Sequence, residues 1–144
     1  MKRPARQDGF TLIELMVVLV IIGLAGAAVM LAIPDAGGSL AGEAERFAAR
    51  AAAARDTAIL ESRPVAVQIG RSGYEVTRRV GGVWRTEARY AWAERTMPDV
   101  AGSGEAGIRF DSTGFAEPVR VTLRRGDRQA ASDIAGDGGV RVVR

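Results

Sequence analysis

The chain has 144 residues, of which 47% are hydrophobic, and a formal net charge of +3 at pH 7. It contains neither cysteine nor histidine. The absence of cysteine excludes disulfides and thiol chemistry, and the absence of histidine removes the usual general base and the commonest metal ligand. The length is enough for one membrane anchor and one small domain. The small excess of basic residues does not by itself indicate a nucleic-acid-binding protein.

A short basic leader, residues 1–9, begins the chain. It carries three basic side chains, Lys2, Arg3 and Arg6. From Leu15 to Ile33 no residue is charged, and a helix of this length spans roughly 28 Å, close to the hydrocarbon thickness of a bilayer. We therefore expect a transmembrane and assembly helix over residues 10–34. The positive-inside rule places the leader in the cytoplasm and the rest of the chain outside it, in a single pass.

Glu14 lies just inside this apolar run. A carboxylate costs about 2.5 to 3.5 kcal/mol at mid-bilayer and less near the interface, so Glu14 needs a shallow position or a partner. One interpretation is an uncleaved anchor with Glu14 at the headgroup level. The other is cleavage between Gly9 and Phe10, after which Glu14 of one subunit neutralises the new Phe10 amine of the next subunit in a helical assembly.

A secretory signal peptide is a further alternative, because Ala25-Gly26-Ala27 resembles an A-x-A cleavage site. Two observations count against it. The apolar run continues past Ala27 to Ile33, and Glu14 would serve no purpose in a segment that is discarded. Small residues in this run, among them Gly23 and Gly26, either allow neighbouring helices to approach closely or reflect ordinary transmembrane composition.

After Pro34 we expect one domain over residues 35–144, beginning with a Gly-rich joint and with Ser39 as an N-cap candidate. Residues 40–62 have helical periodicity. Apolar residues at spacings of three and four form a stripe that should pack on a sheet: Leu40, Ala44, Phe47, Ala51, Ala54 and Ala58. Off the stripe lie four charged residues, which we interpret as a solvated face: Glu43, Arg46, Arg50 and Arg55.

From residue 64 to the end of the chain the period changes to two, which predicts antiparallel strands. Val65, Val67 and Ile69 alternate with polar or small residues. Gly81-Gly82 predicts a hairpin turn. Tyr90 and Trp92 are expected in the core or at a sheet edge.

Residues 97–107 are predicted to be a mobile connection. Within them Gly102 to Gly107 matches G-x-G-x-x-G, but no helix is expected to follow, so we do not predict a dinucleotide site.

The last third of the chain alternates clearly and predicts an antiparallel meander, with a turn at residues 111–114. Five arginines are expected on its outward face and could form a basic patch: Arg120, Arg124, Arg128, Arg141 and Arg144. A solvated sheet face is the preferred interpretation. We find no G-x-S-x-G motif and no set of residues suited to a triad or a metal site, so we expect no enzyme, no catalytic residue, no metal and no cofactor.

The segment Gly9-Phe10-Thr11-Leu12-Ile13-Glu14, between a basic leader and an apolar helix, resembles the prepilin signature of type IV pilins and type II secretion pseudopilins. The resemblance implies that a prepilin peptidase removes residues 1–9 and methylates the Phe10 amine. It also implies that Glu14 is the carboxylate used in subunit assembly. The implied fold is α+β and pilin-like, with a long N-terminal helix, transmembrane and then amphipathic, packed on antiparallel β-sheets.

The C-terminal pattern is similar to that of minor pseudopilin H of type II secretion and of FimT-type minor pilins. It consists of Ile108-Arg109-Phe110, then Gly114, the alternating residues 119–123 and a terminal Gly-Gly-Val-Arg-Val. The first resemblance implies a periplasmic domain on an inner-membrane anchor, incorporated near the pseudopilus tip. The implied partners are the prepilin peptidase, the other minor pseudopilins, the major pseudopilin and an inner-membrane assembly platform.

The alternative is a FimT-type minor pilin of a type IV pilus, some of which bind DNA during uptake through a C-terminal Gly-Arg-x-Arg motif. The corresponding stretch here, residues 139–144, departs from that motif, and the C-terminal cysteine of those relatives is missing. Arg141 and Arg144 remain as the candidate DNA or partner patch. We expect secretion rather than nucleic-acid binding.

Overall fold

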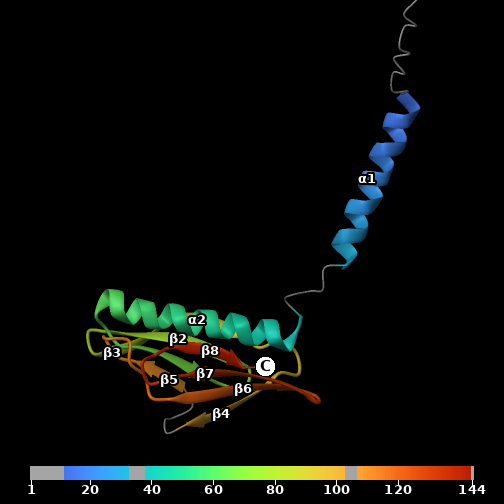
Figure 1. Ribbon diagram of the computed structural model, residues 1–144. Helices are drawn as coiled ribbons and strands as arrows, with labels where there is room; N and C mark the ends of the chain where they lie inside the picture. Colours follow the sequence, from blue (N-terminus) through green and yellow to red (C-terminus); the bar gives the residue numbers. More distant parts are fainter. Residues whose placement is uncertain (1–11, 33–37, 103–106, 144) are drawn as a thin grey trace, which may run out of the picture. The chain divides into compact units, whose positions relative to one another are not determined.

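The computed structural model describes residues 12–32, 38–102 and 107–143, with side chains for all of these except 28–32. The chain forms two compact units, Met1–Ala36 and Gly37–Arg144. In the described residues the first unit holds helix α1, and the second holds helix α2 and strands β1 to β8 (Figure 1). The cleavage site expected at Gly9 and Phe10 and the helix interruption expected at Pro34 lie outside the described residues.

Helix α1 (Leu12–Ala32) covers most of the segment expected to be helical from 10 to 34. Its composition is apolar apart from Glu14, as the charge-free run predicts. A search of the described residues finds no helix with both the length and the hydropathy that crossing a membrane requires.

Helix α2 (Leu40–Glu61) confirms the predicted amphipathic helix and its cap. The Ser39 hydroxyl accepts a hydrogen bond of 3.0 Å from the Gly42 amide, which satisfies one of the free N–H groups of the first turn. The helix ends at Ser62, which adopts a left-handed conformation with φ 51°. The predicted apolar stripe is buried along its whole length, from Leu40 to Ala58.

The strands form two antiparallel sheets of four strands each. The first has the order β3-β2-β1-β5 and contains β1 (Val65–Ile69), β2 (Gly73–Val80), β3 (Val83–Ala91) and β5 (Gly107–Phe110). The second has the order β4-β6-β7-β8 and contains β4 (Met97–Gly102), β6 (Val119–Arg125), β7 (Arg128–Ile134) and β8 (Val140–Val143). Helix α2 packs on strands of both sheets, which makes it the spine of the C-terminal unit (Figure 1).

Phe47 is the main bulky contact of α2, as the sequence predicts. Its side chain is fully buried, and its ring meets Tyr74 edge-on at 5.0 Å and Trp92 at 5.6 Å between centroids. The other residues of the stripe are mostly alanines, which let the helix backbone approach the sheets closely. Trp92 is buried and Tyr90 is half-buried, so the expectation that both belong to the core or its edge is confirmed.

The prediction of a mobile connection over residues 97–107 is wrong for its described part. Residues 97–102 form β4 and pair with β6. Strand β4 lies at the edge of its sheet, where a proline is tolerated because its missing N–H does not interrupt the pairing of inner strands. Two glycines of the G-x-G-x-x-G match, Gly102 and Gly107, have a structural role. A Cβ at Gly102 would lie 2.9 Å from the carbonyl oxygen of Pro118, and a Cβ at Gly107 would lie 2.7 Å from the carbonyl oxygen of Val67.

The last third of the chain is not one meander. Strand β5 pairs with β1, in the first sheet, with Ile108 opposite Val67 and Phe110 opposite Val65. Only β6, β7 and β8 follow one another as a meander, and β4 completes their sheet. Alternation placed the buried side chains correctly, but it carries no information on which sheet a strand joins. The predicted turn at residues 111–114 is present, because the Gly114 amide donates to the Asp111 carbonyl at 3.0 Å.

Candidate assembly site

Glu14 is the acidic residue of the first turn of α1. Its side chain is exposed, and a carboxylate at this end of a helix is favoured by the helix dipole. The neighbouring apolar side chains from Leu12 to Leu24 are also exposed, between 44% and 81%. A helix that is apolar all round is typical of a membrane or a protein core. Taken by itself, α1 therefore presents a surface that suits burial among other helices.

The two glycines of α1 are not required by contacts within the chain. A Cβ built at Gly23 or at Gly26 would meet nothing within 4 Å. These positions therefore remain open for the close approach of a second helix, as small residues allow in membranes.

The outward arginines of the second sheet are partly neutralised. Arg120 forms a two-pronged ion pair with Asp133, with N···O distances of 2.6 and 2.7 Å. Arg124 lies 3.7 Å from Asp99. Arg141 is exposed on β8 and stands opposite Asp133 in the strand register, and Arg144 lies outside the described residues. The expected solvated sheet face describes this surface better than a continuous basic patch.

The Arg120–Asp133 pair makes the stability of this sheet dependent on pH. Hydrogen bonds from Arg120 lower the pKa of Asp133. The stabilisation is therefore complete above the ordinary carboxyl pKa, about 3.9, and is lost as pH falls through the lowered value. We expect Arg120→Gln to be less stable than the parent at pH 7 and equal to it below that value, as measured by urea unfolding. The exposed Arg128→Gln is the control, and a pH-independent gap for R120Q would contradict this account.

Glu43 is a buried charge that the sequence analysis assigned to the solvated face, and this assignment is wrong. Its Oε1 accepts a 2.7 Å hydrogen bond from the Ala93 amide. Its Oε2 accepts from the Thr96 hydroxyl at 2.9 Å and from the Arg125 guanidinium. The cluster of Glu43, Thr96 and Arg125 ties the start of α2 to the β3–β4 connection and to the end of β6. The signal was present, because residue 43 follows Leu40 by three and precedes Phe47 by four.

Arg125 extends this cluster toward the N-terminal joint. Its Nη1 donates to the Gly38 carbonyl oxygen at 2.7 Å, and Nε and Nη2 donate to the Thr96 hydroxyl at 3.1 and 2.8 Å. Arg125 thus donates four hydrogen bonds, which end on Glu43, Thr96 and Gly38. Arg125 fixes the point at which the chain enters α2.

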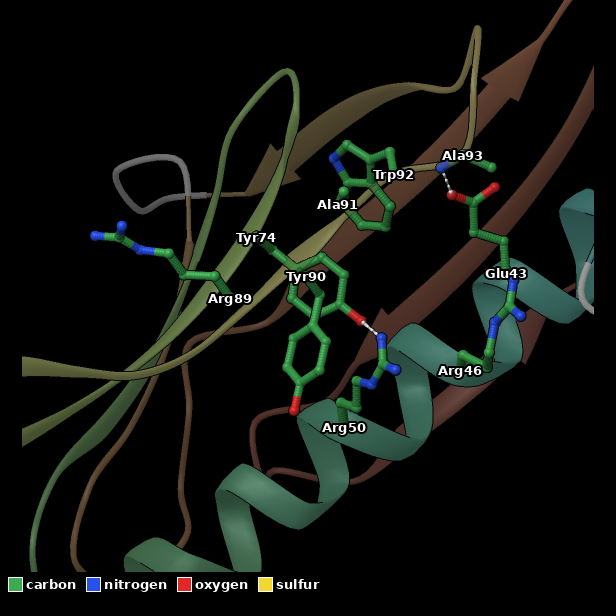
Figure 2. A pocket seen from close by; sticks show the side chains of 9 residues that line it. All are labelled: Glu43, Arg46, Arg50, Tyr74, Arg89, Tyr90, Ala91, Trp92 and Ala93. Atoms are coloured by element: carbon green, nitrogen blue, oxygen red, sulfur yellow. Dashed lines mark hydrogen bonds between the residues drawn. The ribbon is translucent and has the colours of Figure 1, made fainter.

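Arg50 and Arg55 were also assigned to the solvated face, but both make contacts within the domain. Arg50 donates a 2.7 Å hydrogen bond to the Tyr74 hydroxyl, and its guanidinium lies 3.7 Å from the centroid of the Tyr90 ring. Arg55 donates to the Gly114 carbonyl at 3.3 Å. Arg46 is exposed, as expected. Figure 2 shows Arg50 pointing from α2 toward Tyr74 and Tyr90, which line a pocket together with it, whereas Arg46 extends toward Glu43.

Within residues 12–32, 38–102 and 107–143 no group of three or more acidic side chains is placed to hold a metal ion. The clusters described above consist of ion pairs and aromatic contacts. Their geometry suits holding helices and strands of the C-terminal unit together.

Two family models match the chain. A prokaryotic N-terminal methylation motif matches residues 4–30, which include Gly9, Phe10 and Glu14. The model of type II transport protein GspH matches residues 43–139, which cover most of α2 and nearly all of the strands.

A relative of known sequence and two solved structures agree with these models. The chain is 33% identical to type II secretion system protein H of Pseudomonas aeruginosa, over 83% of this chain and 77% of that protein. The minor pseudopilin EpsH of Vibrio cholerae has a similar fold, with a TM-score of 0.60, 17% identity, and coverage of 69% of this chain and 92% of that chain. The type IV minor pilin FimU of P. aeruginosa also has a similar fold, with a TM-score of 0.62 and 14% identity. The match covers 73% of this chain and 88% of that chain.

The predicted α+β pilin-like fold is confirmed by these two structures. The prediction of a minor pseudopilin is confirmed by the family model and by the relative. The chain belongs to the type II transport protein GspH family.

Proposed function

We propose that the chain is a structural minor pseudopilin, which acts by entering a type II secretion pseudopilus and presenting its C-terminal domain to neighbouring subunits. The observation that carries this proposal is the presence, in one chain, of the N-terminal methylation motif and of the GspH domain. The motif supplies the means of entering a filament, and the domain is that of the secretion family.

Processing is the first step of the proposed mechanism. A prepilin peptidase cleaves between Gly9 and Phe10, removes the basic leader and methylates the new Phe10 amine. The match of the methylation motif to residues 4–30 supports this step. Before assembly the chain is anchored in the bacterial inner membrane in a single pass, with its leader in the cytoplasm and its domain in the periplasm.

Assembly is the second step. The carboxylate of Glu14 in one subunit pairs with the Phe10 ammonium of the next, so that each charge is neutralised where it is buried. The exposed apolar side chains of α1 then pack against the same helix of neighbouring subunits. Glu14 contributes to register and order of addition, and the apolar surface contributes most of the binding free energy.

The proposed position is near the pseudopilus tip, between the other minor pseudopilins and the major one, after delivery by the inner-membrane assembly platform. The role is structural, and no catalytic step is assigned to the chain. Its contacts with partners are made by α1 in the filament and by the surface of the C-terminal unit outside it.

Deletion of the gene in its native bacterium tests this function. We expect exported proteins to accumulate in the periplasm and DNA uptake to stay unchanged, because secretion needs a complete pseudopilus. Secreted and periplasmic fractions are compared by enzyme activity and by mass spectrometry, with the intact gene on a plasmid as the control. Normal secretion together with lost DNA uptake would contradict the secretion function.

The alternative function is that of a minor pilin in a type IV pilus, which could bind DNA. The likeness to FimU favours it as far as the fold goes. It requires an affinity for DNA that falls steeply with salt and is reduced by Arg141→Gln and Arg144→Gln. The pairing of Arg120 with Asp133 and of Arg124 with Asp99 leaves a smaller basic surface than this alternative needs.

A further inference from the structure

The outer face of the first sheet, which is turned away from α2, carries an indole and a guanidinium in contact. Val65, Val67 and Ile69 of β1 belong to the core, so the residues that alternate with them lie on the outer face. The strand register then places Trp84 of β3 and Arg109 of β5 on this face as well. The Arg109 guanidinium lies over the Trp84 ring, 5.6 Å from its centroid.

This contact spans the width of the sheet. Strands β3 and β5 are its two edges, with β2 and β1 between them, so the two side chains meet by reaching across two strands. Between them in the register, Ala66 and Thr77 are buried although both point away from the core. Trp84 is half-buried and Arg109 is exposed. The outer face therefore presents a flat apolar centre with a cation beside it.

The outer face also has an excess of positive charge. Its carboxylate on β2, Glu75, is already held by Arg89 at 2.9 Å. Arg79 is exposed and stands directly opposite Trp84 in the register. Within residues 12–32, 38–102 and 107–143 neither Arg79 nor Arg109 takes part in an ion pair. We call the surface formed by Trp84, Arg79 and Arg109 the Trp84 platform.

Both arginines of the Trp84 platform have donors to offer. Stacking on the indole occupies the face of the Arg109 guanidinium and leaves its N–H groups at the rim of the plane. Arg79 uses its Nε to donate to the Gly82 carbonyl oxygen at 3.3 Å and keeps its two Nη groups. Trp and Arg are among the residue types that carry most of the binding free energy of protein interfaces. Because Trp84 and Arg109 already hold each other in place, little side-chain entropy is lost on binding.

We propose that the Trp84 platform docks onto an acidic patch of a neighbouring pseudopilin, where an apolar side chain of the partner packs on the indole and carboxylates beside it bind Arg109 and Arg79. That the partner is a pseudopilin rests on the proposed function; that its surface is acidic rests on the charge of the platform. A second copy of this chain docked through the same face would set arginines against arginines. Binding a single strand of nucleic acid takes several stacking rings along a groove, whereas the described part of this face has one.

The indole of Trp84 reports on the platform directly. The chain has only Trp84 and Trp92, so a nitrogen-proton spectrum of the processed full-length chain in detergent contains two indole signals, which Trp84→Phe assigns. Trp92 is buried and donates its Nε1–H to the Gly70 carbonyl oxygen, so its signal is the internal control. The probes are an acetylated Asp-Glu-Phe-Glu-Asp amide, its Asn-Gln-Phe-Gln-Asn counterpart and a short oligothymidylate.

We expect the acidic peptide to shift the Trp84 signal saturably while the Trp92 signal stays in place. The uncharged peptide should bind at least tenfold more weakly. Arg109→Gln and Arg79→Gln should each weaken the acidic peptide severalfold, and Arg128→Gln, at an exposed position on the second sheet, should leave binding unchanged. Arg79 lies outside the stacked pair, so R79Q keeps the test valid if the loss of Arg109 disturbs the sheet.

Complementation of the gene deletion tests the docking in the native bacterium. A chain that carries both Arg79→Glu and Arg109→Glu should be processed and anchored normally. Its co-purification with the other pseudopilins and its secretion should fall severalfold, because the platform now repels an acidic partner. Arg128→Glu is the control for an added negative charge and should behave as the parent chain.

Equal binding of the two peptides, an unshifted Trp84 signal, full binding by R79Q, or normal co-purification of the double variant would overturn the proposal. Stronger binding of the oligothymidylate than of the acidic peptide would also overturn it, in favour of a nucleic acid. The gene deletion separates this proposal from the proposed function. A failed platform leaves the secretion defect of the deletion in place, whereas a failed function leaves secretion normal whatever the peptides do.

Discussion

Replacing Arg125 by methionine is expected to destabilise the C-terminal domain by about 3 kcal/mol or more, because it leaves the buried carboxylate of Glu43 without its cation. The side chain of Glu43 is only 6% exposed, against 26% for Arg125. The substitution also removes donors from Thr96 and from the Gly38 carbonyl. The free energy of unfolding of residues 35–144, measured in urea, gives the size of the effect.

Two further variants separate a buried charge from a general loss of packing. Arg128→Met removes an exposed arginine close to Arg125 in the chain and should change stability by no more than about 0.5 kcal/mol. Combining Arg125→Met with Glu43→Leu removes both charges and should recover much of the loss. If the double variant is as unstable as Arg125→Met alone, the uncompensated carboxylate is not the cause.

Replacing Glu14 by leucine is expected to abolish most secretion while the chain remains in the membrane fraction. Leucine extends the apolar surface of α1, so anchoring is retained. The Phe10 ammonium of the neighbouring subunit then loses its partner on burial. Breaking a buried ion pair costs about 3 to 5 kcal/mol, which lowers the assembly equilibrium on the order of a hundredfold or more.

Complementation of the gene deletion measures this effect through the secreted fraction and through co-purification with the other pseudopilins. Glu14→Asp keeps the charge and should retain part of the activity, and Glu94→Leu, at an exposed position after β3, should be fully active. Normal secretion by the Glu14→Leu chain would rule out the pairing of Glu14 with the Phe10 amine.

Periodicity predicted the elements that bury one face. Helix α2 was predicted within a residue of its observed end, because its alanine stripe, Phe47 and the Ser39 cap all lie in one short stretch of sequence. The alternation of Val65, Val67 and Ile69 predicted β1 for the same reason. Each of these signals is local, and the surrounding structure agrees with it.

Long-range pairing could not be predicted in this way. Strand β5 lies between β4 and β6 in the sequence but pairs with β1 in the other sheet. This pairing depends on Ile108 and Phe110, which lie opposite residues about forty positions earlier in the chain. Strand β4 contains Pro98 and two small residues at its end, so its propensity is low, and pairing with β6 makes it a strand.

The candidate sites differ in the same respect. The candidate assembly site is a contiguous motif around Glu14, so it can be recognised from the sequence alone. The Glu43 cluster joins residues from 38 to 125, and the Arg50 pocket joins α2 to β2 and β3. In both cases a charge looked solvated because its partner lies far along the chain.

The mass of the N-terminus of the chain, isolated from the membranes of its native bacterium, tests the central claim most directly. The account predicts one species that begins at Phe10 and carries one added methyl group on its amine. A chain that keeps Met1 and the leader would contradict the processing step, and a chain that begins at Ala28 would identify the N-terminal segment as a discarded secretory signal.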